Sequence, residues 1–185
     1  LRLYDSFEPA VMDHAAFGVH ILFEEGLLRR FIKKDDWDGI IRAAIAKHSD
    51  FKLEGITDER ALLHAKIIRD ADKLDNCRVK IADAVETIIG VTEEQVGGEE
   101  ISPEVMEQFM KKESILSPTR KTKMDYWLSY LAYFFDINFN ETLDIIREKR
   151  YVQRIIDRIP YTNPKTARQM EEVRKMLALY IGEEL

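Results

Sequence analysis

The chain has 185 residues, 45% hydrophobic and 34% charged, a composition typical of a folded globular protein and not of a disordered chain. Its formal net charge of −6 argues against non-specific binding to nucleic acid or to an anionic membrane surface. The single cysteine, Cys77, excludes an internal disulfide and favours a reducing compartment, so we expect a cytoplasmic protein.

Apolar residues recur at helical spacing along nearly the whole chain, and no alternating strand of useful length is found. The sequence therefore predicts an all-α protein. The first helix is expected to begin at Pro9, to carry His14 on its apolar face and to end near Gly26. The second helix is expected from about Trp37, with His48 on its apolar face.

The third helix is expected to begin after Thr57, whose side chain can cap it, and to run towards Ile89. At about 100° per residue, one stripe of this helix contains Ala65, Ile68, Asp72, Asp75 and Val79. Asp70 falls on the other side, near Lys66 and Lys73, and is predicted to be solvated surface charge.

Asp72 and Asp75 are therefore predicted to point inwards. A carboxylate in apolar surroundings is costly unless a metal ion, a cation or several donors meet it. For Asp72 the two interpretations are a structural ion pair with arginine or lysine and a role in a functional site. For Asp75 we expect a structural role or one behind the ligands of such a site.

The C-terminal half reads as further helices. The acidic stretch VTEEQVGGEEI, residues 91–101, is predicted to be a loop and a boundary between a core at 1–90 and a helical extension at 102–185 packed on that core. Within the extension we expect a short helix that Ser102 caps and Pro103 opens, followed by a basic loop SPTRKTK at 117–123. An aromatic helix at 126–135 and a helix at 139–159 are expected next. A last helix is expected from Asn163–Pro164, with Met170, Val173, Leu177 and Tyr180 in register.

Two histidines lie on apolar faces of consecutive helices, His14 on the first and His48 on the second. A lone histidine on such a face is more often a satisfied core residue, but these two and an inward Asp72 make a more specific set. Imidazole and carboxylate suit a catalytic transition-metal, magnesium or manganese centre. Gly18, one turn after His14, allows a neighbouring helix to approach closely. His64 is interpreted as a core residue or as the periphery of the site.

Three segments resemble the downstream motifs of HD-domain metal-dependent phosphohydrolases: DHAAFG at 13–18, IRAAIAKH at 41–48 and IIRDADKLD at 67–75. The resemblance implies an HD-domain-like helical bundle that holds one or two divalent ions, whether Mn, Fe, Co, Ni, Mg or Zn. Asp72 matches the family's last aspartate, His14 and His48 match two intermediate histidines, and Lys73 matches a basic residue that faces phosphate.

The chain departs from this family at its most diagnostic point, because the first histidine and the His-Asp pair occur nowhere in the 185 residues. LRLYDSFEP, at residues 1–9, resembles the loop that follows that pair, and the first residue is Leu1. We therefore expect a chain that begins within the domain; truncation is favoured as the reason, and evolved loss of the two motifs is the alternative. If the chain were the whole polypeptide, metal affinity and hydrolysis would be severely impaired.

The resemblance implies a phosphohydrolase that acts on a small phosphorylated substrate, a nucleotide or another phosphate ester, with Asp72 and Lys73 as catalytic residues. Arg120, Lys121 and Lys123 form a basic cluster that either receives the phosphates of a nucleotide or is a solvated loop without a role. The alternative is a degenerate HD-fold helical module that binds or regulates without hydrolysing.

Two further interactions are expected to be absent. No apolar run reaches the 18 or more residues of a membrane span, and we expect no membrane partner. Nucleic-acid binding through the basic loop and the aromatic helix is also not expected, because Trp127, Tyr130, Leu131 and Phe134 recur at core spacing. The sequence does not determine the oligomeric state.

Overall fold

The computed structural model describes residues 13–183 and shows an all-α chain, with no strand among these residues. The chain forms two compact units, of which unit 1 ends at Asp72 and unit 2 begins at Lys73. This division falls inside the long helix α3 (Glu59–Ala82), whose two parts belong to different units. The chain thus divides before the predicted boundary at 91–101, a stretch that contains helix α5 (Glu93–Gly98).

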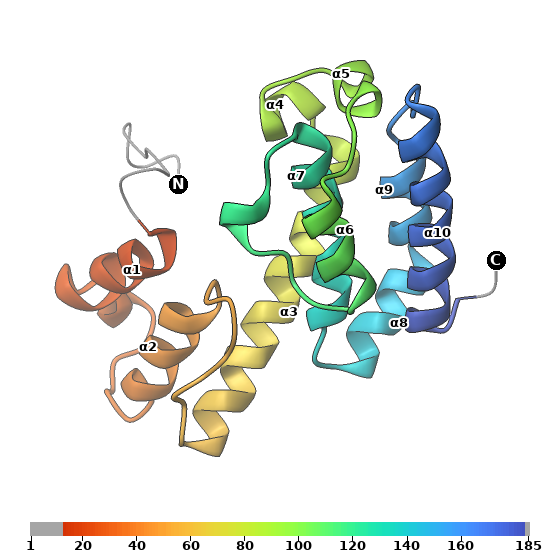
Figure 1. Ribbon diagram of the computed structural model, residues 1–185. Coiled ribbons are helices and arrows are strands. Elements are labelled where there is room, and N and C mark those ends of the chain that lie inside the picture. Colours follow the sequence, from red (N-terminus) through yellow and green to blue (C-terminus); the bar gives the residue numbers. More distant parts are fainter. Residues whose placement is uncertain (1–12, 184–185) are drawn as a thin grey trace. The chain divides into compact units, whose positions relative to one another are not determined.

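Unit 1 consists of α1 (His14–Val19), a π-helical turn (His20–Glu24), a 3-10 turn (Leu27–Arg30), α2 (Asp38–Lys47) and the first part of α3 (Figure 1). The predicted helix start at Pro9 lies outside the described residues. Asp13 caps α1, because its carboxylate accepts a hydrogen bond of 2.9 Å from the Ala15 backbone. A Cβ atom at Gly18 would lie 3.3 Å from Ile45 Cγ2, so the expected close approach of a second helix is confirmed.

The buried apolar side chains of unit 1 are small. In its described part they are Ala15, Leu28, Ala44, Ala61 and Ala65. Large side chains stay at the surface instead, with 73% of Phe31 and 43% of Trp37 exposed. The helices of unit 1 therefore pack through close backbone approach and not around a bulky core.

Unit 2 contains the second part of α3 and seven further α-helices among the described residues: α4 (Val85–Ile89), α5 (Glu93–Gly98), α6 (Pro103–Met110), α7 (Lys123–Ala132), α8 (Asn140–Glu148), α9 (Tyr151–Asp157) and α10 (Pro164–Ile181) (Figure 1). Its core is large and apolar. Trp127, Leu131 and Phe134 are fully or almost fully buried in it, which confirms the predicted core role of the aromatic segment.

The start of α10 follows the prediction. Asn163 accepts hydrogen bonds from the backbones of Lys165 (2.9 Å) and Thr166 (3.2 Å), and Pro164 opens the helix. Its predicted core positions Met170, Val173 and Leu177 are buried, whereas Tyr180, placed in the same register, is 38% exposed.

Predicted features of α3, of α6 and of the segment 139–159 were wrong. The cap of α3 is Asp58, which accepts from the Ala61 backbone at 2.7 Å, and α3 ends at Ala82. Pro103 does open α6, but the hydroxyl of Ser102 donates to Asp125 and does not cap the helix. The predicted helix at 139–159 is two helices, because Arg150 adopts the left-handed conformation (φ 51°, ψ 42°) between α8 and α9.

Candidate functional site

His14 and His48 meet in unit 1, although 34 residues separate them in the sequence. His14 opens α1, and His48 is the residue after the last turn of α2. Their Nε2 atoms lie 3.1 Å apart, and their ring centroids are 5.0 Å apart in an edge-on arrangement. The structure therefore brings together two of the three residues predicted to bind a metal.

The ring of His48 is fixed on its other side. Its Nδ1 lies 2.7 Å from the backbone carbonyl oxygen of Ile45, which can only accept a hydrogen bond. Nδ1 therefore carries the proton of the neutral ring, so His48 Nε2 accepts the 3.1 Å hydrogen bond that His14 Nε2 donates. A histidine whose second nitrogen donates to a backbone carbonyl is the arrangement found in most histidine metal ligands.

The pair is open to solvent. His14 is exposed and His48 half-buried. Asp13, next to His14, has its carboxylate 4.0 Å from His14 Nδ1. Two imidazole nitrogens this close could bind one borderline-soft divalent ion such as Zn²⁺, Ni²⁺ or Co²⁺ once the ring that donates their hydrogen bond has moved its proton to its other nitrogen. Yet no group of three or more His, Cys, Asp or Glu side chains that could hold a metal ion occurs among residues 13–183.

The orientation predicted for the aspartates of α3 was wrong. Asp70, predicted to be surface charge, is only 2% exposed. Asp72 and Asp75, predicted to point inwards, are exposed, and Asp75 forms an ion pair of 2.7 Å with Arg78. The orientation of Asp72 therefore does not support a functional site at this position.

The reason lies in the residues that α3 buries. Its fully buried positions are Ala61, Ala65, Arg69, Asp70, Lys73, Cys77 and Lys80. This face combines small residues with long cationic side chains, whose methylene stems can cover apolar surface. The apolar residues of the predicted stripe fit this face only in part, because Ala65 is buried but Ile68 and Val79 are only half-buried. The apolar pattern therefore placed the inner face of the helix on the wrong side.

His64 is exposed and does not lie in the core, so the core interpretation was wrong. It lines an apolar cleft of about 320 Å³ in unit 1 with Trp37, Ile41 and Ile68. The Arg60 guanidinium stacks 4.1 Å from the centre of the Trp37 ring at this cleft.

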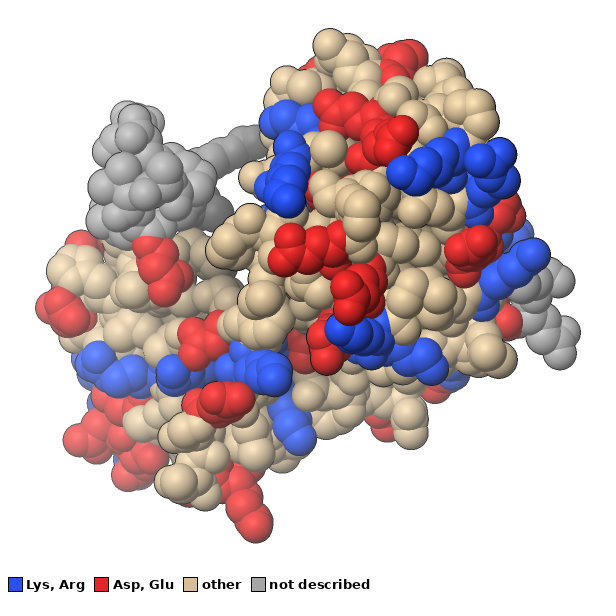
Figure 2. Space-filling model, viewed as in Figure 1, with Lys and Arg blue, Asp and Glu red and all other residues tan. Residues whose placement is uncertain are grey.

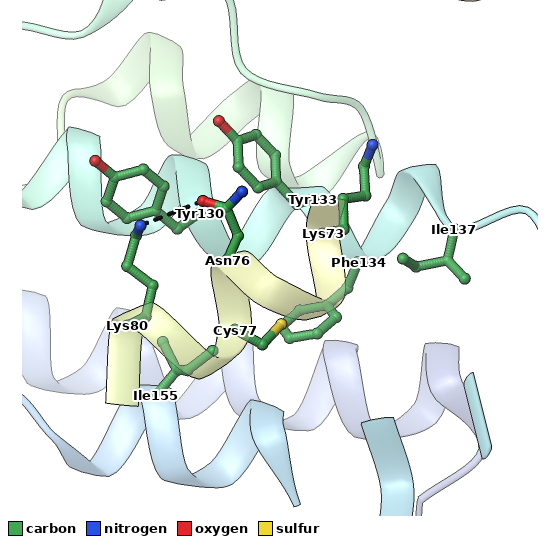
Figure 3. A pocket seen from close by; sticks show the side chains of 9 residues that line it. All are labelled: Lys73, Asn76, Cys77, Lys80, Tyr130, Tyr133, Phe134, Ile137 and Ile155. Atoms are coloured by element: carbon green, nitrogen blue, oxygen red, sulfur yellow. Dashed lines mark hydrogen bonds between the residues drawn. The ribbon is translucent and has the colours of Figure 1, made fainter. Parts of the chain in front are cut away.

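Lys73 is buried in unit 2, where its ammonium group forms an ion pair of 2.9 Å with Asp136. It shares a small pocket with Asn76 and Lys80 of α3 and with Tyr130 and Tyr133 of the aromatic segment (Figure 3). The enclosed space is about 10 Å³, which at most one water molecule fills, so this pocket is not a substrate site.

Lys80 and Cys77 of α3 also line this pocket. The ammonium group of Lys80 lies 4.0 Å from the centre of the Tyr130 ring and 3.4 Å from Asn76 Oδ1 (Figure 3). Cys77 points to the opposite side, towards Phe134 and Ile155 (Figure 3). Burial raises the pKa of the Cys77 thiol to about 12, so the thiol is protonated at neutral pH and is a poor nucleophile.

The predicted phosphate-binding loop has partners of its own in unit 2. Arg120 stacks 4.4 Å from the centre of the Tyr126 ring, and its guanidinium donates to Ser129 Oγ at 3.3 Å. Lys121 lies 3.9 Å from a Glu104 carboxylate oxygen. Lys123 donates to the Ile89 carbonyl at 2.9 Å. Each of the three cations thus has a partner within the protein, and Lys123 also lies 5.8 Å from the centre of the Tyr126 ring that Arg120 stacks on.

Charged side chains on the visible face of unit 2 are mixed in sign, with Lys and Arg interspersed among Asp and Glu (Figure 2). Among the helices that the structure describes, none combines the length and apolar character needed to cross a bilayer.

Arg69 is the site residue that the sequence did not reveal. It is 4% exposed and holds the turn that follows α2. The available signal was its spacing, because Arg69 continues the four-residue repeat of the small residues Ala61 and Ala65.

Comparison with known proteins adds no relative, because no family model, curated protein or solved structure matches this chain.

Proposed function

We propose that the chain is a metal-dependent phosphohydrolase, or the downstream part of one, that acts on a nucleotide or another phosphate ester in the cytoplasm. Its proposed metal ligands are His14 and His48, which meet in unit 1, and Asp72, which the resemblance alone supplies because residues 13–183 contain no group of three such side chains that could hold a metal ion. The proposal rests on the resemblance of three segments to the HD-domain family and on one observation, the convergence of the two Nε2 atoms at 3.1 Å.

The residues of the pair have distinct parts in this proposal. His48 is presented as a neutral ligand, since Ile45 holds the proton on Nδ1. His14 supplies the second nitrogen from the first turn of α1. Asp72 is exposed and is the last residue of unit 1 in the sequence. A divalent ion held by these ligands would act as a Lewis acid towards a phosphoryl oxygen and supply hydroxide at neutral pH.

The role proposed for Lys73 is more demanding. An ammonium group can donate to a phosphate oxygen as a point charge. In this structure the same group is engaged by Asp136 at 2.9 Å and is buried. Lys73 can therefore contact a substrate only if its ion pair with Asp136 breaks.

The second candidate is a helical binding or regulatory module that has the fold without the activity. It is favoured by a specific observation: residues 13–183 offer no set of three metal-ligating side chains. The exposed large side chains of unit 1, such as Phe31 and Trp37, also suit a surface that another polypeptide covers.

The test is a metal titration of the full chain after chelator treatment, with Mn, Fe, Co, Ni, Mg and Zn compared by calorimetry. We expect His14→Ala and His48→Ala each to weaken binding by at least about tenfold, because each removes one ligand nitrogen. His20→Ala is the matched control: His20 follows α1 directly, is exposed and contacts Glu24 at 2.7 Å. Asp72→Ala is compared with Asp75→Ala on the same helix.

Hydrolysis is then measured on a panel of nucleotides and a generic phosphodiester with the tightest-binding metal. Metal binding that His14→Ala and His20→Ala affect equally would show that the pair is not the site. Binding that depends on the pair, without hydrolysis of any substrate in the panel, would favour the regulatory module. An unchanged metal affinity in Asp72→Ala would remove Asp72 from the ligand set.

A further inference from the structure

The turn that carries His48 exposes several backbone carbonyls. Helix α2 ends at Lys47, and the last carbonyls of a helix have no partner within it. The carbonyl oxygen of Ile45 accepts a hydrogen bond from Nδ1 of the His48 ring. The carbonyls of His48, Asp50 and Phe51, in the turn that follows, also need donors from outside the helix.

Arg69 supplies those donors from α3, 21 residues beyond His48. Its Nη1 donates to the carbonyls of His48 at 2.9 Å and Asp50 at 2.5 Å, and its Nη2 donates to the carbonyl of Phe51 at 3.1 Å. The side chain is buried, with 4% exposed. A planar guanidinium with a fixed fork of donors suits three carbonyls better than a single ammonium group does.

The ion pair on the same turn is a weaker restraint. Lys47 and Asp50 are joined at 2.8 Å, but their side chains are 42% and 35% exposed. Solvated pairs of this kind contribute about 0–1 kcal/mol. The buried guanidinium therefore carries most of the restraint that these two contacts place on the turn.

We propose that Arg69 is a positioning residue for His48: by clamping the turn after α2 it holds the His48 ring where its Nδ1 meets Ile45 and its Nε2 meets His14. The proposal rests on the proposed function for its metal readout, but the ring geometry can be tested without metal. Arg69 acts through the backbone of the ligand and does not touch the metal.

Two measurements on the full chain test the proposal. Side-chain ¹⁵N NMR at pH 8, where an ordinary imidazole is neutral, reports the tautomer of His48. In the wild type we expect the proton on Nδ1, and in Arg69→Gln a mixture of tautomers. Calorimetric titration with Ni²⁺ should show affinity about 10- to 100-fold lower in Arg69→Gln, the usual loss when a residue that orients a ligand is removed.

The matched control is Arg78→Gln, on the same helix, where the arginine is exposed and pairs with Asp75. It should leave both the tautomer and the affinity as in the wild type. Circular dichroism verifies folding. If Arg69→Gln does not fold, Arg69→Lys is measured instead; it keeps the charge but loses the fork, so we expect the same direction of change.

The outcomes separate the two proposals. A folded Arg69 variant with the wild-type tautomer and an affinity within twofold of the wild type would overturn the positioning role. If the Arg69 variant gives that result while His48→Ala still loses metal binding, the proposed metal site is supported and the positioning role of Arg69 is not. If the wild type binds no metal but the tautomer changes in the Arg69 variant, the positioning role stands and the metal function fails.

Discussion

At the scale of single residues, Asp125 is the most heavily bonded carboxylate in unit 2. It is fully buried and is the third residue of α7. Its oxygens accept from the Ser102 hydroxyl (2.6 Å) and from the backbones of Ser102 (2.8 Å), Lys121 (2.8 Å) and Thr122 (3.0 Å). It therefore joins the start of α6 to the start of α7.

These donors decide the charge state of Asp125. Burial by itself raises the pKa of the carboxyl, but the Ser102 hydroxyl and the three backbone N–H groups together lower that pKa by more, and the net pKa is below its ordinary value. A carboxyl whose pKa is lower in the folded chain stabilises it above the unfolded-state pKa of about 3.9. The stabilisation is lost as the pH falls through the folded-state pKa.

We therefore expect Asp125→Asn to lower the free energy of unfolding by about 2–3 kcal/mol at pH 7, because an amide leaves buried N–H donors unpaired. The difference from the wild type should shrink below about pH 4. Urea titrations at pH 7 and pH 3 measure it. Asp144→Asn, which alters an exposed carboxylate, is the control and should change stability by less than about 0.5 kcal/mol. An equal difference in the free energy of unfolding between wild type and Asp125→Asn at pH 7 and pH 3 would contradict the proposed dependence on the charge of Asp125.

Sequence reasoning at this scale succeeded where the signal was local. The start of the last helix at Asn163–Pro164 was predicted correctly, and the cap that Asn163 forms there involves only its own backbone neighbours. His14 and His48 were placed on the apolar faces of consecutive helices; their Nε2 atoms do lie 3.1 Å apart, but His14 is exposed and His48 only half-buried. The inner face of α3 was not predicted. Arg69 lies on that face and donates to backbone carbonyls 18 to 21 residues away, a contact that a pattern of neighbouring residues does not reveal.

At the scale of elements, α5 shows how glycine can mark contact instead of flexibility. Gly97 and Gly98 were expected in a loop, but both lie in this helix. A Cβ atom at Gly97 would lie 2.1 Å from the Pro160 carbonyl oxygen, whereas one at Gly98 would lie 3.7 Å from Thr162 Oγ1. The backbone after α9 thus rests directly on Gly97, whose carbonyl accepts from Thr162 at 3.1 Å.

The two glycines form a matched pair of tests. Gly97→Ala should lower the free energy of unfolding by about 1–3 kcal/mol, because backbone must move to admit the methyl group. Gly98→Ala has room and should leave that free energy unchanged or raise it by up to about 1 kcal/mol, since alanine is the better helix former. Urea unfolding followed by far-UV circular dichroism measures both. Equal effects of the two substitutions would show that the contact with Pro160 does not govern the site.

The break between α8 and α9 marks the limit of prediction at this scale. The segment 139–159 has helical spacing and contains no glycine or proline, so the sequence predicts one helix. Arg150 nonetheless adopts a left-handed conformation, which costs an L-residue about 1–2 kcal/mol. Burial of Val152, Ile155 and Ile156 on α9 compensates this cost. Because that burial depends on the packing of the whole of unit 2, the local sequence does not reveal the break.

At the scale of the whole molecule, the two units differ in what they bury. Unit 2 buries large side chains such as Trp127, Phe109 and Leu131, each contributing about 1.5–3 kcal/mol. The fully buried apolar positions of unit 1 in the described residues are four alanines and Leu28. We therefore expect unit 1 to unfold more easily than unit 2, and the chain not to unfold in a single two-state step.

The chain provides its own reporters for this prediction, because it has two tryptophans, Trp37 in unit 1 and Trp127 in unit 2. Trp127→Phe leaves Trp37 to report on unit 1, and Trp37→Phe leaves Trp127 to report on unit 2, so each reported unit keeps its native sequence. In urea, Trp37 fluorescence should change at a lower midpoint and with a smaller slope than Trp127 fluorescence, because less surface is exposed when unit 1 unfolds.

Far-UV circular dichroism of the wild type is the control for both variants, since it should show two transitions at the midpoints that the tryptophans report. Coincident fluorescence curves would mean that unit 1 and unit 2 unfold cooperatively, with α3 as the element that couples them. The result also bears on metal binding. If unit 1 is the less stable unit, a metal bound only to its folded histidine pair should raise the Trp37 midpoint and leave the Trp127 midpoint unchanged.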